Sequence, residues 1–176
     1  MDAKNIYSTA ARLGVPFGAY LSALSAAMVF SDQSQVLPVV ALAMMVCLPM
    51  ALYRMQRRSH ILDPVTPYAG IWLLGMVTLI FASLICAMVS YVLITTMRPD
   101  FINEQMQAAI NVYSATPELR DSQLVEAMRT VQKENLLPTP IEYVIQMFWM
   151  TSFSGSMLSA FTALLAVKLP HRQRRV

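Results

Sequence analysis

The sequence predicts an all-α integral membrane protein with four transmembrane helices and a helical hairpin between the third and the fourth. Hydrophobic residues make up 56% of the chain and charged residues only 13%, an unusual balance for a water-soluble domain. Four long stretches carry no charge, and none shows strand-like alternation. Helices must therefore satisfy the backbone hydrogen bonds in lipid, because only helices and closed barrels can do so.

The four uncharged stretches define the spans. They contain nineteen residues between Arg12 and Asp32, twenty-one between Asp32 and Arg54, thirty-four between Asp63 and Arg98, and twenty-five between Glu142 and Lys168. A helix of about 20 apolar residues crosses about 30 Å of hydrocarbon. We therefore expect spans near 13–31, 36–53, 68–97 and 141–168, in a single membrane domain over residues 1–176.

The first stretch has a second interpretation, as a signal peptide. Lys4 and Arg12 would form its basic region, and the small residues from Ala23 to Ala27 would be its cleavage site. However, Gly14, Pro16 and Gly18 interrupt its apolar core. We therefore expect a helix that is retained.

The third stretch is longer than a bilayer requires. Thirty residues from Tyr68 to Met97 make a helix of about 45 Å at about 1.5 Å per residue, so it must tilt or project from the membrane. Pro99 disfavours a helical conformation at Arg98. A break is therefore expected at residues 97–99.

Residues 99–137 are predicted to form a helical hairpin outside the membrane. Thr116 and Pro117 fit the start of its second helix, and "TPIE" at residues 139–142 fits a capping box that starts the last span. The apolar residues fall on one stripe of each helix. We expect these apolar residues to pack on each other, on the bundle, on lipid or on a partner. They include Ile102, Met106, Ile110, Tyr113, Leu124, Met128 and Val131.

The distribution of basic residues predicts the orientation. With the N-terminus inside, the inner segments carry nine of the thirteen Lys and Arg residues and a net charge of +7, and the outer segments carry −4. Basic residues favour the cytoplasmic side. Both termini are therefore expected in the cytoplasm, with the hairpin on the opposite side of the membrane.

Small residues recur at helical spacing in the first and last spans. Such residues let helix backbones approach closely in membranes. The predicted interface, either within one bundle or between copies or partners, comprises Gly14, Gly18, Ser22, Ala26, Ser152, Gly155, Ser156 and Ser159.

Basic clusters flank the spans on the inner side. They either fix the orientation or hold anionic lipid headgroups, and they comprise Arg54, Arg57, Arg58, Arg172, Arg174 and Arg175. Because these residues flank membrane spans, the high isoelectric point does not imply nucleic-acid binding.

No chemical motif stands out, and we expect no catalytic residue, no metal site and no cofactor. Cys47 and Cys86 lie within spans. No Asp, Glu, Lys or Arg occupies the middle of a span, where such a residue would indicate ion-coupled transport. Gln146 is the strongest isolated polar side chain of the spans. The acids of the hairpin have the spacing of a solvated helix face.

The chain resembles a known family. The resemblance rests on four spans, the basic "YRMQRR" after the second, the long "YAGIWLLGMVTLIFASLICAMVSYVLITTMRPDF", a helical insert, and a last span with glycine and serine that ends in basic residues. These features are similar to the bacterial membrane family known as domain of unknown function 4199 (DUF4199). The resemblance implies a multi-pass inner-membrane protein without established activity, in gene neighbourhoods with glycosyltransferases that act on lipid-linked sugars.

Three functional classes follow. We expect a non-catalytic accessory or scaffold subunit that associates with itself or with another integral membrane protein, for example a glycosyltransferase that acts on lipid-linked sugars. A small channel or lipid-handling transporter would need a polar path through the bundle. An enzyme on a lipid-linked substrate would need polar side chains that converge near Arg98, Asp100 and Glu142.

Overall fold

The computed structural model describes residues 3–33, 36–62, 66–115, 123–134 and 136–168. Its elements are α1 (Ala3–Val29), a 3-10 helix η1 (Ser31–Gln33), α2 (Val36–Leu62), α3 (Tyr68–Met97), α4 (Phe101–Ala115), α5 (Gln123–Lys133) and α6 (Pro140–Lys168). The part of the chain that the structure describes is all-helical. Helices α1, α2, α3 and α6 are long and apolar enough to cross a membrane, as predicted.

The observed helices extend beyond the uncharged stretches at one end of the bundle. Helix α1 begins at Ala3 rather than near residue 13, and α2 continues to Leu62 rather than ending near residue 53. Charged residues do not end a helix, because long Lys and Arg side chains can keep their charges in water while their stems lie along apolar surface. A count of uncharged residues therefore underestimates helix length where basic residues follow.

Helix ends elsewhere lie where the local sequence places them. Helix α3 ends at Met97, before the Arg98–Pro99 pair. Helix α6 begins with Pro140, and the backbone N–H of Thr139 donates a 2.8 Å hydrogen bond to the Glu142 carboxylate. This bond is one half of the predicted capping box.

Helix α3 forms the centre of the bundle. It packs against α1 on one side and α6 on the other, while α2 packs mainly against α6. Two glycines of α1 allow the closest approach to α3: a Cβ atom added at Gly14 would lie 2.7 Å from the Cβ of Phe81, and one added at Gly18 would lie 2.9 Å from the Cβ of Ile85. Larger residues at either position would push the two helices apart.

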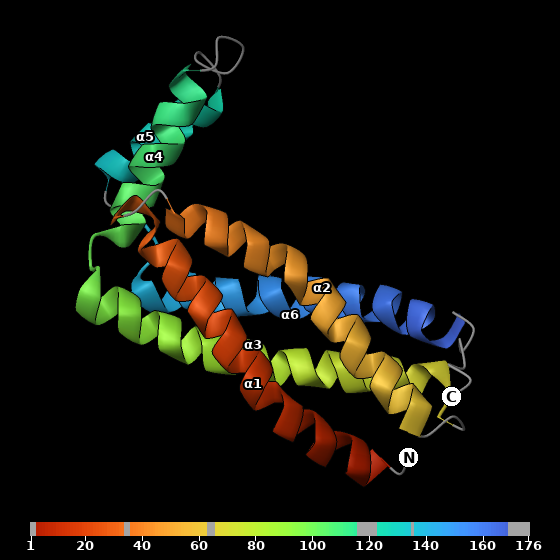
Figure 1. Ribbon diagram of the computed structural model, residues 1–176. Coiled ribbons are helices and arrows are strands. Elements are labelled where there is room, and N and C mark those ends of the chain that lie inside the picture. Colours follow the sequence, from red (N-terminus) through yellow and green to blue (C-terminus); the bar gives the residue numbers. More distant parts are fainter. Residues whose placement is uncertain (1–2, 34–35, 63–65, 116–122, 135, 169–176) are drawn as a thin grey trace.

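Helices α4 and α5, which we call the arm, pack against each other and project from one end of the bundle (Figure 1). The start of α1 and the end of α6 lie at the opposite end. Ile110 of α4 and Val125 of α5 are buried. Hydrogen bonds also join the two helices, from Gln132 to Gln107 (2.9 Å) and from Arg129 to Ser114 (3.3 Å).

Candidate functional site

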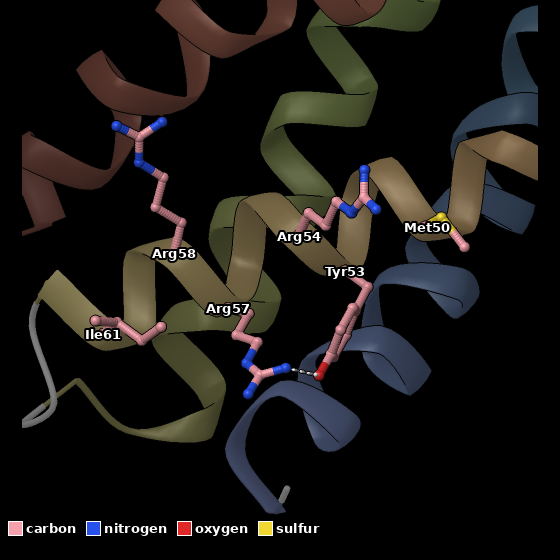
Figure 2. Close-up of a pocket in the computed structure, with 6 residues that line it drawn as sticks. All are labelled: Met50, Tyr53, Arg54, Arg57, Arg58 and Ile61. Carbon is pink, nitrogen blue, oxygen red and sulfur yellow. Dashed lines mark hydrogen bonds between the residues drawn. The ribbon is translucent and has the colours of Figure 1, made fainter. Parts of the chain in front are cut away.

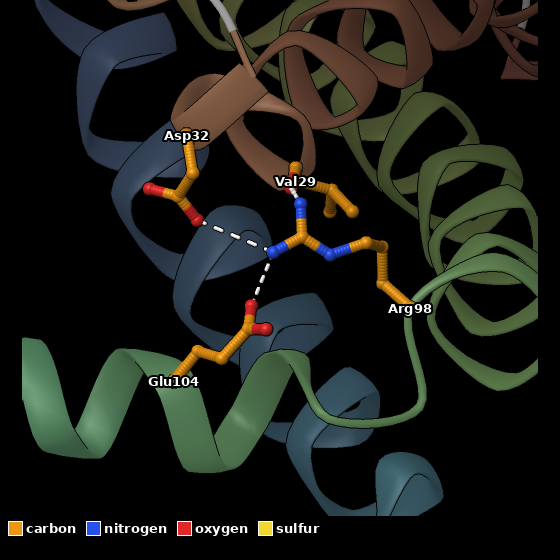
Figure 3. A network of polar contacts seen from close by, with 4 residues as sticks. All are labelled: Val29, Asp32, Arg98 and Glu104. Carbon is orange, nitrogen blue, oxygen red and sulfur yellow. Dashed lines mark hydrogen bonds and ion pairs between the residues drawn. The ribbon is translucent and has the colours of Figure 1, made fainter.

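The junction between the bundle and the arm is held by one arginine. Arg98 follows the last residue of α3, and its guanidinium forms ion pairs with Asp32 (3.3 Å) and Glu104 and donates a 3.3 Å hydrogen bond to the Val29 carbonyl. Figure 3 shows that these partners come from η1, α4 and the end of α1. We call Arg98, Asp32 and Glu104 the clasp, because it links α3 to three other elements.

The clasp is a stable charged group. The Arg98 side chain is 15% exposed, against 59% for Asp32 and 47% for Glu104. The hydrogen bond to Glu104 raises the pKa of Arg98 above its ordinary value, and the bond to Asp32 acts in the same direction. Arg98 therefore remains a cation throughout the physiological pH range, so loss of its proton does not open the clasp in that range.

An apolar cluster lies at the same junction. Val29, Ile94, Phe101 and Val144 are buried together, with one residue each from α1, α3, α4 and α6. The rings of Phe101 and Tyr143 meet edge to face, with their centroids 6.2 Å apart. The apolar cluster and the clasp together fix α4 of the arm to the bundle, because α4 contributes Phe101 to the cluster and Glu104 to the clasp.

The hairpin residues that sequence analysis selected lie mostly within the arm or the junction. Ile110 is buried, and the partly buried ones are Ile102, Met106, Tyr113, Met128 and Val131. Leu124 differs, since 48% of it is exposed. Their apolar stripes are thus used largely within the chain, and Leu124 is the member that faces solvent.

The small-residue ridges lie at contacts between the chain's own helices. Besides Gly14 and Gly18, Gly155 approaches Leu79 of α3, and Ser152 shares a 2.9 Å hydrogen bond with Ser83 of α3. In α6, the Ser156 carbonyl accepts a hydrogen bond from the Trp72 indole of α3, and Ser159 is fully buried. In α1, the Ser22 hydroxyl donates to the Gly18 carbonyl of the same helix, and Ala26 is partly buried.

A buried glutamine that sequence analysis missed joins three helices. Gln56 of α2 is fully buried, and its Nε2 donates to Ser159 Oγ (2.9 Å) and to the Ser159 carbonyl (3.2 Å) of α6. Ser159 Oγ in turn donates to the carbonyl of Trp72 in α3 (3.0 Å). Gly75 leaves the room for this arrangement, because an added Cβ would lie 2.3 Å from both Gln56 Nε2 and Ser159 Oγ. We call Gln56, Ser159 and Gly75 the polar knot.

The sequence does contain a signal for Gln56. It lies four residues after Leu52, which is also fully buried, and residues four apart share a helix face. Sequence analysis did not infer a buried position for Gln56, because it lies in "YRMQRR", whose arginines indicate a membrane boundary. Gln146, the residue singled out instead, is exposed and lines an open cavity of about 320 Å³ with Tyr143, Met147, Met150 and Thr151.

Two pairs of serine hydroxyl groups in the bundle bind each other rather than line a wide path. The Oγ atoms of Ser25 and Ser90 lie 2.7 Å apart, and those of Ser83 and Ser152 lie 2.9 Å apart. The cavity beside them holds about 20 Å³, which is room for about one water molecule. A polar path of the kind that a channel needs is not formed at this place.

The basic cluster of α2 lines an open groove of about 610 Å³ (Figure 2). Its lining residues are Met50, Tyr53, Arg54, Arg57, Arg58 and Ile61. We call this the basic groove. The other predicted lipid-headgroup residues, Arg172, Arg174 and Arg175, lie outside the described residues.

The other candidates for chemistry lie apart. Cys47 is exposed, Cys86 is partly buried, and neither forms a disulfide. Within the ranges that the structure describes, no three His, Cys, Asp or Glu side chains are grouped as a metal site would require. Near Arg98, the acids that converge are Asp32 and Glu104, and both are paired with the arginine rather than facing a cavity.

Comparison with known proteins places the chain in a family. The profile of a family described as "Protein of unknown function (DUF4199)" matches residues 12–168, which include most of α1 and all of α2, α3, α6 and the arm. No curated protein and no solved structure matches the chain. The match covers most of the sequence and agrees with the resemblance found from its spans, its helical insert and its basic segments, so the chain belongs to the DUF4199 family.

Proposed function

We propose that this protein is a non-catalytic accessory subunit of the bacterial inner membrane, which presents the arm to a partner on the periplasmic side. The observation that carries the proposal is the fixed junction: a clasp and an apolar cluster hold a separate pair of helices outside the bundle. A short helical hairpin is marginally stable alone. Anchoring it on a bundle gives it both stability and a defined direction.

The charge distribution supports the proposed orientation. The first half of α1, the second half of α2 and the end of α6 lie toward the end of the bundle opposite the arm, and their described cations include Arg12, Arg54, Arg57, Arg58 and Lys168. The described cations of the arm and its junction are Arg98, Arg129 and Lys133, which are outnumbered there by Asp32, Asp100, Glu104, Glu126, Glu134 and Glu142. The rule that basic residues stay on the cytoplasmic side then puts the arm in the periplasm.

The partner is proposed to be a second copy of this chain or another integral membrane protein. Both the small-residue ridges and the stripes of the arm are largely used inside the chain. Contact with a partner would therefore involve the solvent-facing side of the arm, around Leu124, rather than the positions inside it. A lipid-linked-sugar glycosyltransferase is the partner that the family resemblance suggests.

A photo-crosslinking experiment tests the proposal. A photoreactive amino acid at Leu124 or at the exposed Ala108 of α4 is expected to give one discrete crosslinked product in native membranes. A product of twice 19.7 kDa would identify a second copy, and another discrete mass would identify a different subunit.

Phe153 provides the matched control, because it is 72% exposed on α6 and should face lipid in the proposed orientation. Its photoreactive variant is expected to give no discrete protein product. If the arm positions give no more product than position 153, the accessory-subunit proposal is wrong.

A further inference from the structure

One side of α2 changes from apolar to cationic along its length. Residues separated by three or four positions share a helix face, and this face begins with Val39, Leu42, Val46 and Met50, which are 66%, 65%, 69% and 57% exposed. The same face continues into the basic groove through Tyr53, Arg57 and Ile61. We call the first four residues the apolar stripe.

The basic groove holds its cations at one level of the helix. Arg57 Nη1 donates a 3.0 Å hydrogen bond to the Tyr53 hydroxyl, and its guanidinium carbon lies 5.8 Å from the centre of the Tyr53 ring. Figure 2 shows that Arg54 and Arg58 point in other directions, with Arg58 on the side of α1. All three arginines line the same groove, so their like charges repel, and an anion bound in the groove would reduce that repulsion.

The three arginines lack a protein counter-ion among the described residues. The ion pairs found there belong to Arg98, at the other end of the bundle. Arg57 bonds to the neutral hydroxyl of Tyr53 instead. An unneutralised cluster of arginines at a membrane boundary attracts anionic groups, and the guanidinium is the side chain best suited to phosphate.

We propose that the basic groove binds the phosphate headgroup of an anionic membrane phospholipid, whose acyl chains lie along the apolar stripe. A lipid fits both halves of this face, since its charge and its hydrocarbon are joined in the same order as the arginines and the stripe. A second copy fits less well, because a two-fold contact would place the same arginines opposite each other. The inference does not depend on the arm or on its partner.

Native mass spectrometry of the full-length, delipidated protein tests the inference, with phosphatidylglycerol and phosphatidylcholine as the two probes. The unmodified protein should retain phosphatidylglycerol in preference to phosphatidylcholine. The double variant Arg54→Gln/Arg57→Gln should reduce that preference by about thirtyfold, because two charges near the headgroup, each contributing about 1 kcal/mol, are removed. Tyr53→Phe should reduce it in the same direction and by less, since the ring remains but Arg57 is no longer held.

A charge-matched double variant distinguishes a site from general attraction. Arg12 of α1 and Lys168, the last residue of α6, are exposed, and neither lines the groove, so Arg12→Gln/Lys168→Gln removes the same charge outside it. This control should retain the preference. An equal loss in both double variants would overturn the proposal and leave the arginines as orientation signals. Displacement of the lipid by millimolar inorganic phosphate would also overturn it, because the groove would then hold a free anion.

Discussion

The variant Gly75→Val should fail to form the folded bundle or should unfold at a much lower temperature than the unmodified protein. The added side chain would enter the space that Gln56 Nε2 and Ser159 Oγ occupy, and would separate α3 from α2 and α6. Overpacking alone costs about 1–3 kcal/mol, and interhelical hydrogen bonds in membranes add about 0.6 kcal/mol each. Thermal unfolding in detergent, followed by size-exclusion chromatography, measures the effect.

Ala69→Val is the matched control for this variant. Ala69 also lies on α3, but it is exposed, so the added methyl groups meet lipid or detergent rather than the polar knot. It should leave the unfolding temperature nearly unchanged. A Gly75→Val protein as stable as this control would show that the three helices do not meet at the polar knot.

The variant Ile110→Asp should unfold the arm while the bundle stays intact. Ile110 is a buried residue of α4, which packs on α5. Loss of a buried aliphatic side chain costs about 2–5 kcal/mol, with a further penalty for a buried charge. Two short helices cannot compensate for that loss. Hydrogen–deuterium exchange should show rapid exchange throughout α4 and α5, with unchanged protection in α1, α3 and α6.

Ala108→Asp introduces the same charge at an exposed position of α4 and should leave exchange in the arm slow. If Ile110→Asp also leaves the arm protected, the packing of α4 on α5 is not what stabilises the arm. If it unfolds the whole protein, the arm and the bundle form one cooperative unit rather than an anchored projection.

Hydrophobicity and local signals predicted most of the fold. Uncharged length found all four long helices, and Pro99 and the capping box at residues 139–142 placed the end of α3 and the start of α6. Uncharged length gave no sign that α1 would begin at Ala3 and α2 would continue to Leu62, because a helix can continue past charged residues.

The contacts between helices were harder to predict. Sequence analysis named Arg98 as the residue before a proline and as a point where an enzyme's polar side chains would converge. It did not identify Asp32 as a partner, because nothing local indicates that a residue sixty-six positions away would bind Arg98. Gln56 was missed because its hydrogen bonds depend on α6 and α3 meeting beside it, at Ser159 and Gly75. A sequence gives the face on which a residue lies, but the partner across that face is set by how the helices cross.

Cysteine labelling in intact cells tests the central claim, that the chain crosses the membrane four times and presents the arm outside the cytoplasm. In a background of Cys47→Ser and Cys86→Ser, single cysteines are placed by Ala108→Cys in the arm and Ile61→Cys near the end of α2, both at exposed positions. A membrane-impermeant maleimide should label the arm in cells whose outer membrane alone is permeabilised, and should label position 61 only after the inner membrane is opened. Labelling of position 61 in those cells, or protection of position 108 until the inner membrane is opened, would contradict the account.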